Sequence, residues 1–390
     1  MPVIKKALTF TFTHRIVGSQ RGSLLCLGLL WLLVQLICYS AYGIRVGADS
    51  AVYKEYAYRL LEGQWPDGRM FWYTSYISLL AGILALGGQV AWVVVVQMSL
   101  SALAALALWK VVRQLSADSL TPFLAVFLYI VWIKIHQWNI FIYTESVFTS
   151  LAILSFSVFF LSKRTWQYFL AVLLIIITFF VRPSGFGFLG GWMVYAMVVV
   201  PLPGRVKWIF VLTAGITVLL LLNFMLTDFV LVESYARGEI IYPGIQMGVD
   251  TPENLRIPDE EKPPLWRLLL FVGYQPWYFV KLCVVKLGLF FANVKPYFSL
   301  LHNALIVLLL YPLYALAIRG YSILSRYRQE KYFMLGFIGI QGFTVMLTTV
   351  DWDGRFLVPI LPFIFILSAF GISSFIKKTS SVSRRGLSKI

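Results

Sequence analysis

The feature that most constrains this chain is the recurrence of apolar runs close to twenty residues long, from residue 23 to residue 376. About 20 apolar residues are what a helix needs to cross a bilayer. Charged residues make up only 13% of the chain, against about 25% in soluble domains, and the mean hydropathy is +0.80. No polar segment is long enough to form a separate domain. The sequence therefore predicts an all-α polytopic membrane protein with one integral membrane domain, residues 1–390, and a helical core at 22–376.

Charge orients the predicted helices, because Lys and Arg collect in cytoplasmic loops. One arrangement places 19 of the 33 basic residues inside, with two acids, Asp118 and Glu330. It has both termini inside, a retained first helix, a basic cytoplasmic tail at 377–390, and about ten crossings, at 24–42, 90–109, 120–135, 142–161, 166–181, 185–200, 208–227, 301–318, 332–350 and 356–376. The net charge of +16 then reflects topology and not nucleic-acid binding.

Two apolar stretches, 73–86 and 277–292, do not fit as crossings. If the second crossed, the basic loop at 319–331 would lie outside. We expect both to be interfacial helices on the outer face, within a first outer loop at 45–88 and a long outer loop at 228–300.

Metal-binding patterns are weak. Cys26, Cys38 and Cys283 lack ligand spacing, and His136 has no neighbouring Cys or His. A zinc site is not expected.

Two carboxylates fall on the predicted outer face at helix starts. Asp49 follows the first helix and Glu145 begins the fourth in "YTESVF". Each has a structural alternative, because Asp49 suits an N-cap, and Glu145 gains from the helix dipole with Thr144 as cap.

Cations gather on the same face against the positive-inside bias. Arg182 follows the fifth helix in "VRPSG", and Arg355 is expected at the start of the last helix, where it must find an anion. Asp351 and Asp353 are the structural partners expected for Arg355, and a lipid phosphate is the functional one. Lys281 and Lys286 lie on the interfacial segment.

Carboxylates among cations at headgroup depth suit transfer from a lipid-phosphate donor. The catalytic candidates, Asp49 and Glu145, would accept a proton from an incoming hydroxyl, and Arg or Lys would hold the departing phosphate. No nucleotide-binding loop is found, and the membrane itself would present the donor.

These segments resemble a known family. "GADSAVYKEYAYRLLEGQWP" with "YTSYISLLAGILALGG" resembles the first outer loop and following helix of GT-C glycosyltransferases, which use polyprenyl-phosphate sugars. "YTESVFTSLAILS", "VRPSG" and "DWDGRFLVPILPFIFILSAFGI" are similar to the protein-mannosyltransferase and aminoarabinose-transferase branch. The resemblance covers most of the chain and implies a GT-C-like fold in a bacterial inner membrane, with the active site on the exoplasmic face.

The resemblance implies a role for particular residues. Asp49 matches the catalytic base of the first loop, and transfer to an acceptor hydroxyl would invert the anomeric carbon. The substrate-binding set that we assign is Arg182, Arg355, Lys281, Lys286, Tyr53, Tyr73, Asp351 and Asp353. Ser50 stands where many members carry a second acid, so no cofactor is assigned and a divalent metal stays open. The acceptor is a glycan, lipid or protein.

Two other functions stay open. A polysaccharide polymerase or ligase of O-antigen type would place key arginines in the large outer loop, where Arg237 and Arg256 lie. A transporter of lipid-linked glycans would show repeated halves and polar groups near the midplane. We find no such repeat.

Overall fold

The computed structural model describes residues 19–201, 203–209, 212–213, 231–242, 244–324 and 328–387. Within them the chain is helical and forms no β-strand, only isolated bridges between loops, which confirms the all-α fold. The elements are α2 (Gln20–Tyr42), α3 (Ala48–Leu61), η1 (Gly68–Tyr73), α4 (Thr74–Ala85), α5 (Val90–Leu115), α6 (Leu120–Val131), α7 (Ile133–His136), η2 (Gln137–Asn139), α8 (Thr144–Leu161), α9 (Thr165–Phe179), α10 (Gly185–Val199), α12 (Leu231–Ala236), α13 (Pro264–Tyr274), α14 (Pro276–Ala292), α15 (Leu300–Ile323), α16 (Arg328–Leu347), η4 (Val358–Ile360) and α17 (Leu361–Leu387).

Five helices of the described chain are long and apolar enough to cross a membrane: α2, α5, α8, α15 and the segment Val358–Lys378. Two pairs of helices, each bent at a short break, raise the number to seven if each pair counts as one span. The bend is 62° between α6 and the segment Ile133–Ile140, and 105° between α13 and α14. The expected crossings at 166–181 and 185–200 form the shorter apolar helices α9 and α10, and most of 208–227 lies outside the described residues. The protein is therefore polytopic, with five to seven spans by length and composition.

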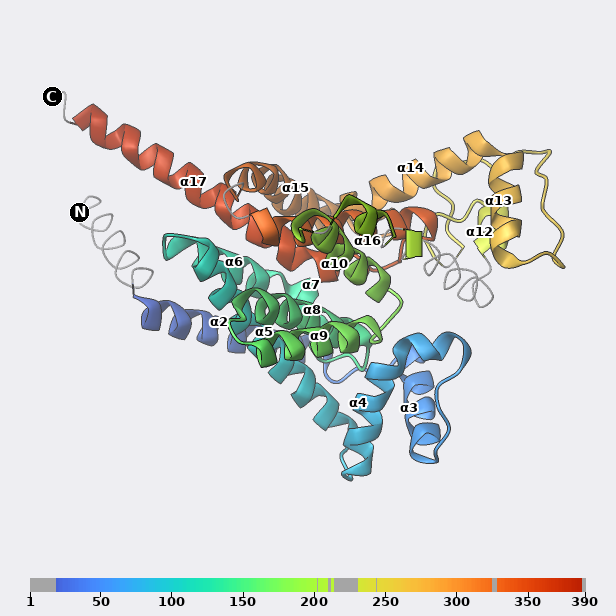
Figure 1. The fold of residues 1–390 in the computed structure, drawn as a ribbon, viewed down its shortest axis with the longest axis horizontal. Helices are drawn as coiled ribbons and strands as arrows, with labels where there is room; N and C mark the ends of the chain where they lie inside the picture. Colours follow the sequence, from blue (N-terminus) through green and yellow to red (C-terminus); the bar gives the residue numbers. More distant parts are fainter. Residues whose placement is uncertain are drawn as a thin grey trace.

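Burial divides the helices into a central and a peripheral set. The α8 and α17 spans are mostly buried, and α17 runs lengthwise through the bundle in Figure 1, where α6 and α15 pack against it. The α2 and α15 spans instead expose most of their length, including leucines such as Leu25 at 67% and Leu301 at 70%. Apolar surface of this extent needs lipid around it.

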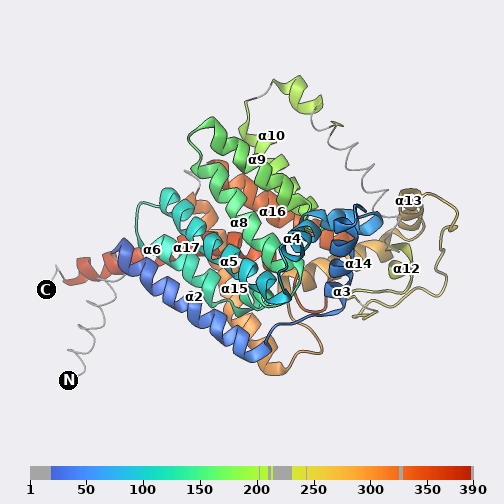
Figure 2. The ribbon, with the colours of Figure 1, turned by 90° about the horizontal axis from the view of Figure 1, so that it is seen from below.

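The non-spanning elements gather at one end of the bundle. In Figures 1 and 2, α3 and α4 lie at the same end as α12, α13 and α14, and the start of α2 and the end of α17 lie at the other. The two stretches expected to be interfacial helices form α4 and most of α14. This end holds the candidate site.

Glycines set the distance between α10 and α16. A Cβ atom added to Gly336 of α16 would lie 2.8 Å from Cβ of Val194 and 3.0 Å from Cα of Gly191, whereas one added to Gly339 would meet nothing within 4 Å. Small residues at such a crossing let two backbones approach closely in a membrane. Helices α10 and α16 would have to move apart to accommodate a larger side chain at Gly336.

We therefore expect Gly336→Leu to lower the thermal unfolding midpoint of the detergent-purified protein, by an overpacking penalty of about 1–3 kcal/mol. Gly339→Leu, one turn further along the same helix, is the matched control and should not lower it. Equal midpoints for the two variants would contradict the close α10–α16 contact.

Candidate functional site

Backbone hydrogen bonds join two loops that lie far apart in the sequence. The N–H of Arg45 donates to the Ile140 carbonyl at 3.0 Å, and the N–H of Ile142 donates to the Arg45 carbonyl at 3.1 Å. The Ser50 hydroxyl adds a bond to the Ile142 carbonyl at 2.9 Å. These bonds bring the start of α3 beside the start of α8, and with them Asp49 and Glu145.

Asp49 does not cap α3, so the N-cap alternative is wrong. The helix begins at Ala48 with Gly47 as N-cap, and the Ser50 hydroxyl accepts from the N–H of Gly47 at 3.1 Å. Because Ser50 closes the turn, the carboxylate of Asp49 is not used as a cap, and 44% of its side chain is exposed. It can reach a ligand from solvent.

Thr144 does not cap α8 either. Tyr143 holds the N-cap position without a side-chain cap bond, and the Thr144 hydroxyl donates instead to the Glu145 carboxylate at 3.4 Å. Glu145 stands in the first turn and its side chain is 2% exposed. A carboxylate this buried requires a cation beside it.

Two arginines supply that cation. Arg182 Nη1 lies 2.9 Å from Glu145 Oε1, and Arg355 Nη1 lies 3.7 Å from the same oxygen. The same nitrogen of Arg355 lies 3.1 Å from Asp49 Oδ2. The four side chains, which we call the Asp49–Arg355 cluster, therefore form one network with two charges of each sign.

Arg355 is held charged within this network. Burial alone would lower the pKa of its guanidinium, but Glu145 and Asp49 outweigh burial and raise the pKa above its ordinary value. The expectation that Asp351 or Asp353 would be the partner of its side chain is wrong. The last helix begins later than expected, at Leu361 after η4, so Arg355 lies in a loop and reaches across to α3 and α8.

Asp351 shapes that loop. Its carboxylate accepts from the backbone N–H groups of Asp353 at 3.0 Å, Arg355 at 2.7 Å and Phe356 at 3.1 Å. Gly354 has φ of 75°, and a Cβ there would lie 2.4 Å from Asn293 Oδ1, so only glycine fits. With its carboxylate engaged by backbone groups, Asp351 is a positioning residue and not a substrate contact.

Asp353 points to a different partner. Its carboxylate pairs with Lys134 Nζ at 2.5 Å and accepts from Gln137 at 3.4 Å. It therefore ties the loop to α7 and stands outside the Asp49–Arg355 cluster.

Arg182 is positioned by the tight turn between α9 and α10. Its carbonyl accepts from the N–H of Gly185 at 2.8 Å. The guanidinium carbon lies 5.5 Å from the ring centre of Phe356 and 6.0 Å from that of Phe148. Arg355 lies 5.7 Å from the ring centre of Phe356 as well, so both cations contact this one ring.

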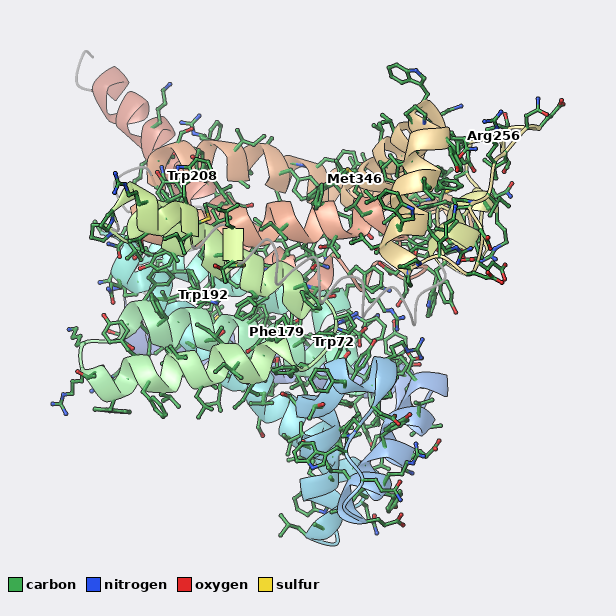
Figure 3. All side chains as sticks on the ribbon, turned by 45° about the vertical axis from the view of Figure 1, so that its right-hand side comes forward. Trp72, Phe179, Trp192, Trp208, Arg256 and Met346 are labelled. Atoms are coloured by element: carbon green, nitrogen blue, oxygen red, sulfur yellow. The ribbon has the colours of Figure 1, made fainter. Side chains whose placement is uncertain are left out.

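Aromatic contacts dock η1 against the same turn. Trp72 and Phe179, labelled in Figure 3, meet edge to face with ring centres 6.1 Å apart. The N–H of Ser75 donates to the Phe180 carbonyl at 3.0 Å. The segment carrying Tyr73 is thereby fixed beside Arg182.

Tyr53 and Tyr73, which the sequence assigns to substrate binding, lie within electrostatic range of the cluster. Their ring centres are 5.3 Å apart. Burial raises the pKa of Tyr53 well above its ordinary value, and Tyr73, Glu145 and Asp49 raise it further. Both hydroxyls therefore stay neutral and able to donate hydrogen bonds.

Tyr143 belongs to the site and was missed in the sequence. A Cβ added to Gly47 would lie 2.1 Å from the Tyr143 hydroxyl, so the tyrosine occupies the space that glycine leaves open. Burial raises the pKa of Tyr143, Asp49 and Glu145 raise it further, and Arg355 lowers it. In the sequence, the only indication of this role was the position of Tyr143 directly before "TES".

Lys281 and Lys286 do not join the cluster. Lys281 is exposed on α14, while Lys286 is buried, donates to the Thr348 carbonyl and lies 4.3 Å from the ring centre of Tyr235. Five residues along a helix turn the side-chain direction by about 140°, so the two cannot face one ligand. Their assignment to the phosphate site is wrong.

A buried polar network supports the loop before α8. Gln97 Nε2 donates to the carbonyls of Asn139 at 2.9 Å and Phe141 at 2.8 Å. Asn139 donates to Gln35 at 2.9 Å and accepts from Ser146 at 2.5 Å. Gln35 and Gln97 stand singly within apolar runs, so their convergence on Asn139 could not be read from the sequence.

Guanidinium donors of the cluster remain open. Nε of Arg182 and Nε of Arg355 are buried and find no hydrogen-bond acceptor in the part of the chain that the structure describes, and Nη1 of Arg182 is ion-paired with Glu145 without forming a hydrogen bond. An unfilled buried donor is unfavourable, so an incoming anion would gain bonds here. Among the same residues, no three His, Cys, Asp or Glu side chains come together as metal ligands.

We expect Glu145→Gln to destabilise the protein strongly, because it leaves Arg182 buried without its anion, a loss of about 3–5 kcal/mol. The thermal midpoint should drop far more than in Asp49→Asn, whose exposed ion pair contributes at most about 1 kcal/mol. Adding Arg182→Met to Glu145→Gln should restore part of the loss. Equal midpoints for Glu145→Gln and Asp49→Asn would contradict the buried pairing.

No protein-family model matches this chain, and no curated protein or solved structure matches it either.

Proposed function

We propose that this protein is a GT-C-type membrane glycosyltransferase that moves a hexosyl or pentosyl group from a polyprenyl-phosphate donor to an acceptor hydroxyl. The observation that carries the proposal is the Asp49–Arg355 cluster. It offers one accessible carboxylate, Asp49, beside two guanidinium groups with open donors, of which Arg182 is buried and Arg355 is partly buried. A base and an anion site within one network suit the transfer of a group that leaves a phosphate behind.

The reaction follows from these positions. Asp49 takes the proton of the acceptor hydroxyl as its oxygen attacks the anomeric carbon. The bond between that carbon and the phosphate oxygen breaks on the opposite face, and the configuration inverts. The polyprenyl phosphate departs with the bonding electron pair, and Arg182 and Arg355 stabilise the charge it gains.

Burial distinguishes the two carboxylates. Glu145 is 2% exposed and held by two arginines, so it serves to fix them. Asp49 is 44% exposed and has a single cation partner. We therefore assign the base to Asp49 alone and give Glu145 a positioning role.

The arrangement of the large outer loop favours this proposal over a polymerase or ligase. Arg237 is 60% exposed and pairs with Glu239 at 3.5 Å. Arg256 is exposed on the outer edge of the α12–α14 unit, as Figure 3 shows. The sequence of this loop contains no histidine, which the alternative would place there beside these arginines.

Asp49→Asn should reduce sugar transfer by about two to four orders of magnitude, because the amide cannot accept the proton. The measurement is consumption of labelled mannosyl, glucosyl, galactosyl and arabinosyl polyprenyl phosphates by membranes containing equal amounts of each protein. Glu55→Gln changes an exposed carboxylate of the same helix and is the matched control. Turnover near that of the wild type in Asp49→Asn, or no donor consumed by the wild type, would refute the proposal.

We further propose about ten crossings in a bacterial inner membrane, with both termini cytoplasmic and the Asp49–Arg355 cluster exoplasmic. The charge distribution of the sequence supports this orientation.

The orientation predicts the labelling of introduced cysteines by an impermeant maleimide added to intact cells. In a Cys26→Ala background, which removes the one exposed native thiol of the described residues, Gln64→Cys and Thr251→Cys should be labelled. Arg164→Cys, also exposed but at the opposite end, should react only after the cells are opened. The reverse pattern would invert the topology.

A further inference from the structure

One aromatic ring is shared by the two arginines of the Asp49–Arg355 cluster. The guanidinium carbons of Arg182 and Arg355 lie over the ring of Phe356, at 5.5 Å and 5.7 Å from its centre. A cation within about 6 Å of a ring centre is attracted by the negative charge of the ring face. Two side chains that repel each other are therefore both attracted to a third one, which takes no part in the proton and phosphate steps of the proposed reaction.

The buried carboxylate alone does not orient these cations. Nη1 of Arg182 and Nη1 of Arg355 lie 2.9 Å and 3.7 Å from the same oxygen of Glu145, and the Arg182 contact is an ion pair without a hydrogen bond. Such a pair fixes a distance but no direction, because only a hydrogen bond requires an angle. The direction of the Arg182 guanidinium must come from other contacts, of which the ring of Phe356 also reaches Arg355.

The backbone of Phe356 is held on both sides. Its N–H donates to Asp351 Oδ2 at 3.1 Å, and its carbonyl accepts from Gln341 Nε2 at 3.3 Å. Gln341 belongs to α16 and is 1% exposed. The ring therefore starts from a backbone that is tied both to its own loop and to a helix of the bundle.

The helix that follows Arg182 makes room for Gln341. A Cβ atom added to Gly187 of α10 would lie 2.5 Å from Gln341 Oε1 and 3.2 Å from Gln341 Cα. Since α10 begins at Gly185, the chain passes from Arg182 into the helix that packs on Gln341. The contacts thus close a circuit from Arg182 through α10 and Gln341 to Phe356 and back, which fixes the ring relative to the guanidinium.

We propose that Phe356 is a positioning residue, which holds Arg182 and Arg355 side by side so that both donate to one phosphate, and that Gln341 fixes it. An aromatic ring is no strong hydrogen-bond acceptor, so it holds a guanidinium without occupying its N–H groups. Nε of both arginines is buried without an acceptor among the described residues and stays available for the anion. The inference rests on the proposed function for the identity of that anion.

The test replaces Phe356 with monofluorinated and trifluorinated phenylalanine in the full chain, by suppression of a stop codon. Fluorine withdraws charge from the ring face and nearly keeps the ring shape, so the attraction for cations weakens while packing stays. We expect the affinity for radiolabelled citronellyl phosphate, measured by scintillation proximity in dodecyl maltoside, to fall stepwise, by roughly three- to tenfold with the trifluorinated ring. Excess citronellol should not displace the probe.

Two controls separate positioning from packing. The same fluorinated residues at Phe156, a buried ring of α8 whose neighbours include Phe160 and Phe363, should leave the affinity unchanged. Gln341→Met removes the bond to the Phe356 carbonyl and should lower the affinity roughly threefold, the loss of one ordinary hydrogen bond. Thr344→Val, which removes a hydroxyl from the same helix, should not lower it.

The outcomes distinguish this inference from the proposed transferase. Equal affinities across the fluorinated series at Phe356, or an equal loss at Phe156, would overturn the positioning role and leave the transferase standing. A stepwise loss in a protein that consumes no sugar donor would support the positioning role and refute the transferase. Failure of the wild type to bind citronellyl phosphate, or its displacement by citronellol, would overturn both.

Discussion

The end of the bundle that holds the Asp49–Arg355 cluster depends on charge compensation around one buried carboxylate. Glu145 begins α8, a central helix, so its side chain can be buried only with cations against it. Arg182 meets this need from the turn between α9 and α10, and Arg355 meets it from the loop before η4. Four parts of the chain are joined once Asp49 binds the same guanidinium of Arg355.

The loop from Asp351 to Arg355 connects the Asp49–Arg355 cluster to the rest of the bundle. Asp351 folds it through three backbone bonds, Asp353 ties it to α7, and Arg355 reaches towards α3 and α8. Just before it, Val350 exchanges backbone bonds with Ile240 and Tyr242 of the long outer loop, each at 2.9 Å. A loop fixed at so many points can hold a guanidinium in a set direction, which preorganised binding of a phosphate requires.

Much of the fold followed from local sequence properties. Apolar runs predicted the helices, and the all-α fold is confirmed, because hydropathy and length act within one segment. The sequence also placed Asp49, Glu145, Arg182 and Arg355 on one face, and the structure brings their side chains together. This convergence has a simple cause, since Asp49 and Glu145 lie in the first turns of α3 and α8, Arg182 and Arg355 lie in connections between helices, and these segments meet at one end of the bundle.

The sequence by itself determined a helical membrane protein with ionisable groups at one end. Only the tertiary structure decided how those groups divide, with Glu145 buried, Asp49 half exposed, Asp351 engaged by backbone and Lys286 turned away. The physical reason is that pairing acts through space. The backbone bridge between Arg45 and Phe141, which joins the two acidic helix starts, links residues almost a hundred positions apart and has no local signature in the sequence.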